Sequence, residues 1–150
     1  MATIPDLTLN DGNLIPQLGY GTFQVPPART AIAVQSALEA GYRHIDTAQM
    51  YGNEAGVGDG VRASGIARED VYVTSKLKTG AHLPDDARRA FEGTLRMLAM
   101  DYVDLFLIHW PMVLSYGGDF ASTWKTLEEF QASGRARSIG VSNFRIVDLQ

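Results

Sequence analysis

Hydrophobic side chains follow two different spacings along this chain. Between residues 84 and 98 apolar and small side chains recur every three or four positions, namely at Ala87, Ala90, Phe91, Thr94, Leu95 and Leu98. This spacing predicts an amphipathic helix, and Pro84 followed by Asp85 and Asp86 favours a helix start there. Residues 103–108 form instead a short continuous apolar run, which is typical of a strand buried on both faces of a parallel sheet.

The same alternation of strand and helix extends over the rest of the chain. Residues 8–18 resemble a small hairpin, because Asp11-Gly12 has the composition of a tight turn. Beyond it, strands are expected at 18–21, 43–46, 70–76, 103–108 and 137–141, and helices at 28–40, 53–65, from 84, at 120–134 and from 143. Strict alternation predicts an α/β fold with a parallel sheet. No linker divides the chain, so we predict a single domain over residues 1–150.

Composition and charge narrow the classes of function. A net charge of −4, a pI of about 5.3 and the lack of a basic run argue against a nucleic-acid partner. Cysteine is absent, and His44 and His82 have no partner at metal-ligand spacing, so no metal site is expected. We interpret His44 as structural and His82 as solvated in a loop. Residues 1–10 lack the features of a signal peptide, and no apolar run is long enough to span a membrane. A soluble cytoplasmic protein without membrane contact is therefore expected.

Polar residues at the ends of predicted strands are the main indication of chemistry. Asp46, Lys76 and His109 end three successive strands, and Tyr51 lies in the loop after the first of them. In a parallel α/β fold these ends share the rim where substrates bind. A phenol with its usual pKa of about 10 is a weak acid, and a neighbouring ammonium lowers that pKa. We therefore predict Tyr51 as a general acid and Lys76 as its activating cation. Asp46 would anchor Lys76, and His109 would orient a carbonyl group by hydrogen bonding.

Each of these residues alone has an ordinary structural explanation. A loop tyrosine usually packs, and a histidine at a strand end is usually buried and hydrogen-bonded, so the prediction depends on all four residues reaching one rim. Two other patterns are not expected to carry chemistry. Tyr72 and Lys76 have the spacing of a helical dehydrogenase pair, but four residues along a strand span roughly 13 Å. Gly56, Gly58 and Gly60 lie in a predicted helix and miss the dinucleotide-binding spacing.

Four stretches together resemble the aldo-keto reductases, in the order and spacing of that family: residues 41–54, 74–77, 103–111 and 139–144. The resemblance extends from the Asn10–Asn13 turn to the last residue. Residues 9–13, 15–21 and 63–67 are most similar to the bacterial 2,5-diketo-D-gluconic acid reductase branch. The resemblance implies a (β/α)₈ TIM barrel with an N-terminal β-hairpin. This chain covers only the N-terminal part of that barrel, about the first five of its eight β/α units.

The resemblance also implies a function and a set of site residues. It implies an NADPH-dependent reductase of aldehydes and ketones, with the family's catalytic tetrad at Asp46, Tyr51, Lys76 and His109. Residues implied to contact NADPH are Gly21, Thr22, Asp46, Ser142 and Asn143. Residues implied to line the substrate pocket are Phe23, Tyr51, His109, Trp110 and Tyr20. Taken from the residues alone, Ser142-Asn143 also fits a helix N-cap.

Lys78 and the length of the chain depart from the family's pattern. The family often has an aromatic residue where this chain has Lys78, and a lysine there favours anionic or polyhydroxylated carbonyl substrates. Further cofactor contacts in the family come from later strands, so weak or absent NADPH binding is expected of these 150 residues alone. Unpaired sheet edges would favour self-association of the chain, whereas an intact enzyme is expected to be a monomer. The alternative is a non-catalytic barrel fragment or a binding or regulatory module.

Overall fold

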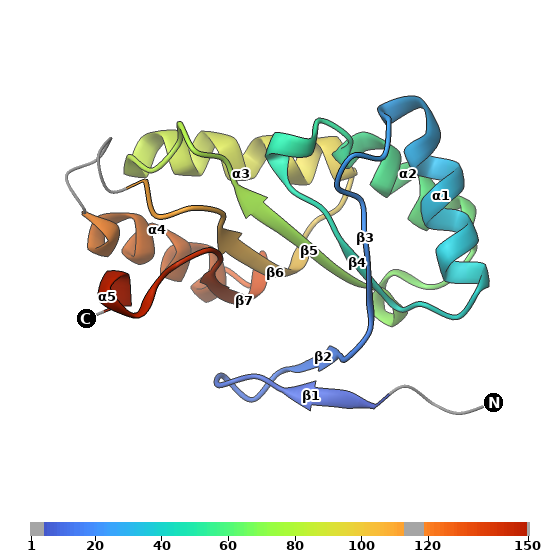
Figure 1. Ribbon diagram of the computed structural model, residues 1–150, viewed down its shortest axis with the longest axis horizontal. Coiled ribbons are helices and arrows are strands. Elements are labelled where there is room, and N and C mark those ends of the chain that lie inside the picture. The colour runs from blue at the N-terminus through green and yellow to red at the C-terminus, as the bar shows by residue number, and fades with distance from the viewer. Residues whose placement is uncertain (1–4, 113–118, 150) are drawn as a thin grey trace.

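Five strands form one parallel sheet in the order β3-β4-β5-β6-β7 (Figure 1). The computed structural model describes residues 5–112 and 119–149. The ends of the predicted domain, residues 1–4 and Gln150, lie outside this part, as do residues 113–118. The strands are β3 Gly19–Gly21, β4 His44–Asp46, β5 Tyr72–Leu77, β6 Val103–Ile108 and β7 Ala136–Val141. Each strand pairs in parallel with the next one in the chain, which confirms the predicted α/β arrangement.

Helices connect successive strands and cover one face of the sheet (Figure 1). The connecting helices are α1 Pro27–Glu39, α2 Glu54–Ala63, α3 Pro84–Leu98 and α4 Phe120–Ala132, and the short α5 Ile146–Leu149 follows β7. Two 3₁₀ turns, η1 Gln49–Tyr51 and η2 Arg68–Asp70, precede α2 and β5. Strands on the inside and helices on the outside form the wall of a (β/α) barrel, of which this chain provides five of the eight units.

Phenylalanine side chains join β6 to the helices that cover it. The Phe91 ring of α3 stacks on Phe130 of α4, with ring centroids 4.1 Å apart and planes 15° apart. Phe91 also packs against Phe106 of β6 at 4.8 Å, and both side chains are fully buried. Burying one such ring contributes about 1.5–3 kcal/mol to stability. The apolar stripe predicted for residues 84–98 is therefore the face with which α3 covers the sheet.

Three glycines let α2 pack closely against its neighbouring helices. A Cβ atom on Gly58 would overlap the carbonyl oxygen of Leu98 in α3, and one on Gly60 would lie 2.6 Å from a backbone oxygen of α1. A Cβ on Gly56 would lie 2.7 Å from the Thr30 Cβ of α1. These residues serve helix packing, in agreement with the expectation that they do not form a dinucleotide-binding loop.

A separate antiparallel hairpin precedes the sheet. Its strands are β1 Asp6–Thr8 and β2 Leu14–Pro16, and Gly12 in the connecting turn has a φ of 85°, which suits glycine. The Asn13 side chain donates hydrogen bonds of 3.1 Å to the Arg137 carbonyl oxygen and to Ser138 Oγ. These bonds attach the hairpin to the start of β7, away from the helices (Figure 1).

Several predicted boundaries differ from the observed ones, and two of these differences have a clear local reason. The strand expected from Asp70 begins at Tyr72, because residues 68–70 form the η2 turn. The helix expected from Asn143 begins at Ile146, because Asn143 has a left-handed φ of 62° that a helix cannot include. Within residues 5–112 and 119–149, no helix has the length and apolarity needed to cross a membrane.

Candidate active site

Four side chains meet at the carboxyl end of the sheet. Asp46 is the last residue of β4, Lys76 is the last but one of β5, and His109 directly follows β6. Tyr51 is the last residue of the η1 turn, which follows β4 closely. Because parallel strands bring their carboxyl ends to one rim, residues that are distant in sequence become neighbours here.

Lys76 lies at the centre of this group. Its Nζ donates a hydrogen bond of 2.5 Å to Asp46 Oδ1 and one of 2.9 Å to the carbonyl oxygen of Thr47. The same Nζ lies 5.2 Å from the centroid of the Tyr51 ring. The Tyr51 ring meets the His109 ring edge to face, with centroids 5.7 Å apart. The structure thus brings together all four residues that the sequence analysis assigned to one rim.

The environment of Tyr51 shifts its pKa in the direction opposite to the expected one. Burial of the phenol raises its pKa above 10.0, and the Asp46 carboxylate raises it further. Lys76 was expected to lower this pKa, but its ammonium is paired with Asp46, whose negative charge offsets it. Tyr51 is therefore a protonated phenol at neutral pH. Its hydroxyl makes no hydrogen bond to the described residues, so the proton is free to be donated.

His109 is a neutral ring beside this phenol. The side chain is buried, and burial lowers its pKa below 6.5; the Lys76 charge lowers it further, while Asp46 acts in the opposite direction. A neutral imidazole carries one N–H group. Neither ring nitrogen of His109 is hydrogen-bonded to the described part of the chain, and Nδ1 is buried. His109 can therefore donate to an oxygen atom placed next to Tyr51.

Besides Asp46 at the end of β4, the residues predicted to contact the cofactor lie at or just after the ends of β3 and β7. Asn143 donates from Nδ2 to the His109 carbonyl oxygen at 2.8 Å and to Ser142 Oγ at 3.0 Å, so this pair adjoins the four-residue group. Gly21 is open on its side-chain face, where a Cβ would meet no atom within 4 Å. Thr22 differs, because its side chain is fully buried and its hydroxyl is directed at the Asp46 carbonyl oxygen, 3.2 Å away.

Two exposed aromatic rings flank the group, as predicted for a substrate pocket. Phe23 is 65% exposed, and its ring centroid lies 5.2 Å from that of Tyr51. Trp110 is 45% exposed, and its ring lies 6.3 Å from that of His109. Tyr20 is not placed with them, because its ring packs edge to face against another tyrosine next to the core.

One further residue, beneath this rim, was not predicted from the sequence to belong to the site. Asn53 was interpreted only as the start of a helix, but it is 1% exposed and its carboxamide is hydrogen-bonded to Thr22, Val25 and Thr47. Asparagine is common at helix starts, and that ordinary explanation hid its inward orientation. A polar residue two positions after Tyr51 was the signal that could have identified it.

His82 is buried, so the prediction that it is solvated was wrong. The side chain is 2% exposed, and its Nε2 donates to the Trp110 carbonyl oxygen at 2.9 Å. The Thr123 hydroxyl of α4 donates to the His82 carbonyl oxygen, also at 2.9 Å. The loop before α3 is covered by α4 and by the segment after β6, which sequence spacing does not reveal. His44 bonds to Thr74 Oγ1 at 2.9 Å, which agrees with a structural role.

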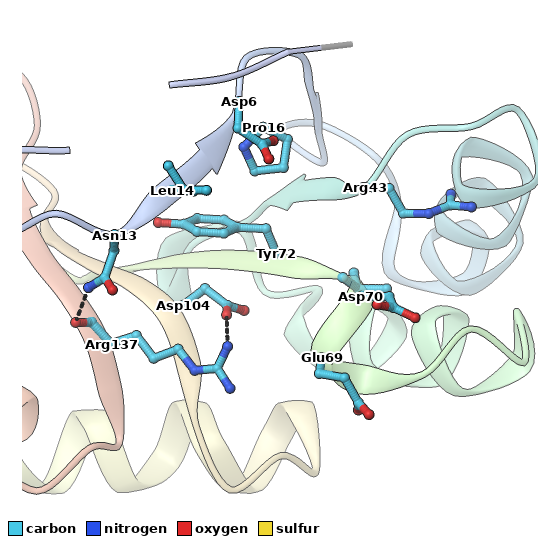
Figure 2. A pocket seen from close by; sticks show the side chains of 11 residues that line it. Asp6, Asn13, Leu14, Pro16, Arg43, Glu69, Asp70, Tyr72, Asp104 and Arg137 are labelled. Carbon is cyan, nitrogen blue, oxygen red and sulfur yellow. Dashed lines mark hydrogen bonds and ion pairs between the residues drawn. The ribbon is translucent and has the colours of Figure 1, made fainter. Parts of the chain in front are cut away.

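A different cavity, of about 390 Å³, lies at the opposite end of the sheet between the hairpin and the starts of β5, β6 and β7 (Figure 2). Tyr72 points into it toward Leu14, and burial raises the Tyr72 pKa to about 12. Asp104 accepts hydrogen bonds from Arg68 at 2.8 Å and from Arg137 at 3.2 Å. Tyr72 and Lys76 thus serve opposite ends of β5, in agreement with the prediction that they do not act as a pair.

The chain matches the Aldo/keto reductase family over residues 17–150. An uncharacterised oxidoreductase of Schizosaccharomyces pombe is 44% identical, over 95% of this chain and 50% of its own length. The D/L-glyceraldehyde reductase of Hypocrea jecorina is 41% identical, with the same coverage of 95% and 50%. The chain therefore spans about half the length of the curated relatives that it matches.

Solved structures share the barrel wall described above. The crystal structure of an aldo/keto reductase from Brucella melitensis has a TM-score of 0.93 and 50% identity, over 98% of this chain and 57% of that one. The structure of a Bombyx mori aldo-keto reductase in complex with NADP has a TM-score of 0.90 and 38% identity, over 99% of this chain and 53% of that one. By sequence and by fold, this chain belongs to the aldo/keto reductase family.

Proposed function

We propose that this chain carries the catalytic residues of an NADPH-dependent reductase that converts aldehydes and ketones to alcohols. The observation that carries the proposal is the contact of Tyr51 with both Lys76 and His109 at the carboxyl rim of the sheet. A protonated phenol beside a neutral imidazole suits the reduction of a carbonyl group, in which the oxygen atom must gain a proton. Membership of a family in which the Bombyx mori relative has been solved with NADP supports the same reaction.

In this proposal Tyr51 and His109 act on the carbonyl oxygen. His109 donates a hydrogen bond that orients the carbonyl and polarises it, and Tyr51 transfers its proton to the oxygen as negative charge develops there. Lys76 stabilises the phenolate that Tyr51 becomes, since its ammonium lies against the ring face. Asp46 keeps that ammonium in place. The raised pKa of Tyr51 keeps the phenol protonated before the reaction, so the proton is present when it is needed.

The residues at the rim fit a nicotinamide. NADPH, when bound, supplies the hydride, and Ser142 and Asn143 would hold its carboxamide. Ser142 Oγ accepts a hydrogen bond from Asn143 Nδ2, and a hydroxyl that accepts one hydrogen bond can still donate its own proton. Gly21 offers the close backbone approach that a flat ring requires, because the space beside it is open. Thr22 would support this wall from below through its buried hydroxyl.

The substrates we propose are small polyhydroxylated or anionic carbonyl compounds, such as aldoses or diketo-gluconate. One relative is named D/L-glyceraldehyde reductase, which is a reductase of a small polyhydroxylated aldehyde. Lys78 is exposed just after β5, two residues beyond Lys76. Its ammonium would attract carboxylates and hydroxyl groups, while the exposed rings of Phe23 and Trp110 would flank the reacting carbon.

Tyr51→Phe tests the reaction. The parent, Tyr51→Phe and a control variant are assayed by following NADPH oxidation with glyceraldehyde as substrate. Each is prepared in two forms: the 150-residue chain alone, and this chain fused to the remaining segment of the Brucella melitensis barrel. We expect Tyr51→Phe to abolish most reduction while leaving NADPH binding nearly unchanged, because only the transferred proton is removed. Tyr72→Phe is the matched control, since it removes a phenol from the opposite end of the sheet and should retain full activity. Substantial turnover by Tyr51→Phe would refute the assigned roles.

Lys78→Trp tests the substrate class. The parent and the variant are compared on a carboxylate-bearing aldehyde and on a neutral aldehyde of similar size. We expect the ratio of kcat/KM values to shift toward the neutral aldehyde, by roughly tenfold if one charge-assisted hydrogen bond is lost. An unchanged ratio would exclude Lys78 from substrate selection.

Self-association is proposed for the isolated chain, and a monomeric state for an intact barrel. The outer edges of β3 and β7 have no partner strand among the described residues, and unpaired edges favour pairing between molecules. Sedimentation velocity of the chain, alone and joined to the Brucella segment, distinguishes the two states. A monomeric isolated chain would contradict the first proposal, and an oligomeric joined barrel would contradict the second.

A further inference from the structure

We infer that Asn53 is a positioning residue for the reductase site, holding the backbone on which Lys76, Asp46 and Tyr51 depend. The inference rests on the proposed reductase function, because it names what fixes that site in place. Asn53 touches neither a reacting group nor the open rim. It lies directly beneath them and is 1% exposed.

The carboxamide of Asn53 makes hydrogen bonds with the segments that follow β3 and β4. Its Nδ2 donates to the Thr22 carbonyl oxygen at 2.9 Å and to the Val25 carbonyl oxygen at 3.0 Å. Its Oδ1 accepts from the Thr47 hydroxyl at 3.0 Å. The Thr22 hydroxyl oxygen is 3.4 Å from the same Oδ1, but its single proton has a nearer acceptor in the Asp46 carbonyl oxygen at 3.2 Å. Both N–H groups of the amide therefore donate a hydrogen bond, and its oxygen accepts one.

These bonds reach the reacting groups through Thr47 and Thr22. The carbonyl oxygen of Thr47 accepts one of the two hydrogen bonds that hold the Lys76 ammonium. The backbone N–H of Thr22 donates to the Asp46 carbonyl oxygen at 2.9 Å, next to the carboxylate that accepts the other. Asn53 thus joins the ends of β3 and β4 below the ion pair of Lys76.

The chain position of Asn53 adds a third connection, to Tyr51. Gly52 separates the two residues and has a left-handed φ of 67°, which turns the chain sharply between the η1 turn and α2. Asn53 is the residue before α2, where an asparagine side chain usually caps the helix, yet this side chain makes no capping bond. It is turned inward instead, so the backbone after Tyr51 is fixed by the same carboxamide that fixes Thr47.

Only an amide side chain satisfies this arrangement. Aspartate would keep an acceptor for the Thr47 hydroxyl but lose both donors and bury a charge. Leucine would leave the Thr47 hydroxyl without a partner and would remove a donor from the Thr22 and Val25 carbonyl oxygens. The position therefore requires two donors and one acceptor on a short side chain. Its fully used hydrogen bonds hold the site in a single geometry before substrate binds.

The test uses Asn53→Ala in the 150-residue chain, with Thr126→Val as the control. Thr126 is equally buried and loses one hydrogen bond inside α4, far from the rim. The first measurement is the pH titration of Tyr51 by NMR of ¹³C-labelled tyrosine, which requires no turnover. Burial is the main cause of the raised Tyr51 pKa, so a loosened rim should bring this pKa down toward 10.0 in Asn53→Ala and leave it unchanged in Thr126→Val.

The second measurement is carbonyl reduction in the preparations described for Tyr51→Phe. We expect kcat to fall by roughly 10- to 100-fold in Asn53→Ala, with the KM for the carbonyl substrate little changed, because positioning acts on the chemical step. A folded Asn53→Ala variant with the parent's Tyr51 titration and kcat overturns the inference. If the parent itself reduces no carbonyl compound, the proposed function fails, and the titration alone decides the role of Asn53.

Thr47→Val decides the question if Asn53→Ala does not fold. This variant removes one hydroxyl donor to Asn53 Oδ1 and keeps the Thr47 carbonyl oxygen that holds Lys76. A smaller shift of the Tyr51 titration in the same direction supports the inference, and an unchanged titration overturns it. Where both variants fold, the double variant should be no worse than Asn53→Ala, because the partner of the hydroxyl is already absent.

Discussion

The Lys76 ammonium lies 2.5 Å from the Asp46 carboxylate, although the two residues are 30 positions apart in the chain. The parallel pairing of β4 with β5 brings them together, and the Lys76 side chain is 7% exposed while that of Asp46 is 33% exposed. This pair sets the charge around Tyr51: the carboxylate holds the ammonium against the ring and also offsets its effect on the phenol. Two predictions follow from its position.

Asp46→Asn should lower the free energy of unfolding by roughly 1.5–3 kcal/mol, which is typical of a lost hydrogen bond to a charged group. The neutral amide leaves the largely buried ammonium of Lys76 without its counter-charge. Asp86→Asn is the matched control, because Asp86 contacts Arg89 at the same 2.5 Å but with side chains 39% and 72% exposed. That exposed pair should contribute less than about 1 kcal/mol. Urea denaturation measures both, and equal losses would contradict the role of burial.

The same Asp46→Asn variant should lower the pKa of Tyr51. The carboxylate is the second of the two causes, after burial, that raise this pKa, and the amide that replaces it carries no negative charge. If Asp46 acted only by holding Lys76 in place, the opposite shift would be expected. Loss of the carboxylate would then weaken the effect of the ammonium on Tyr51 and raise the pKa of the phenol. NMR titration of ¹³C-labelled tyrosine, assigned with Tyr51→Phe, measures the shift. A rise of the Tyr51 pKa would show that positioning outweighs direct repulsion.

Stability should decrease below about pH 6.5 because of the histidines. Burial lowers the pKa of His44, His82 and His109 in the folded chain below the ordinary value of 6.5. Above 6.5 both states are neutral at these rings; as the pH falls below it, the unfolded chain binds protons that the folded chain resists. Each ring then lowers the free energy of unfolding by at most about 1.4 kcal/mol per pH unit.

The His82→Gln variant isolates one of these contributions. Glutamine keeps an N–H donor for the Trp110 carbonyl oxygen but does not titrate, so its stability should decrease less than that of the parent between pH 7.5 and pH 5. Urea denaturation at several pH values gives the two slopes. Parallel slopes for parent and variant would mean that His82 titrates equally in the folded and unfolded chain.

The order of elements could be predicted from the sequence because each one depends on local spacing. The stripe from Ala87 to Leu98 and the run from Val103 to Ile108 report burial directly, and both became the expected element. The four residues at the rim could be predicted for a related reason. Asp46, Lys76 and His109 stand at or beside strand ends, and parallel pairing is sufficient to gather such positions.

Contacts made between loops could not be predicted in the same way. His82 is buried because α4 and the segment after β6 cover its loop. The sequence pattern of residues 78–83 gives no indication of this burial. The pKa of Tyr51 is raised by burial of the phenol and by the nearby Asp46 carboxylate, which depend on packing and distance rather than on residue types. Asn53 occupies a position where asparagine has a common local role, so its inward hydrogen bonds become visible only in three dimensions.

Helical glycines provide the last prediction, because two of them should respond in opposite ways to the same substitution. Intrinsic helix propensity alone predicts that alanine stabilises a helix by roughly 0.5–1 kcal/mol wherever it replaces glycine. Gly93→Ala in α3 should gain this amount, since its Cβ would meet no atom within 4 Å. Gly58→Ala in α2 should instead lose about 1–3 kcal/mol, because its Cβ would overlap the Leu98 carbonyl oxygen and force α2 away from α3. Urea denaturation of the two variants measures both signs. A Gly58→Ala chain as stable as the parent would mean that α2 can shift away from α3 at no cost. The close approach of these helices would then not require glycine.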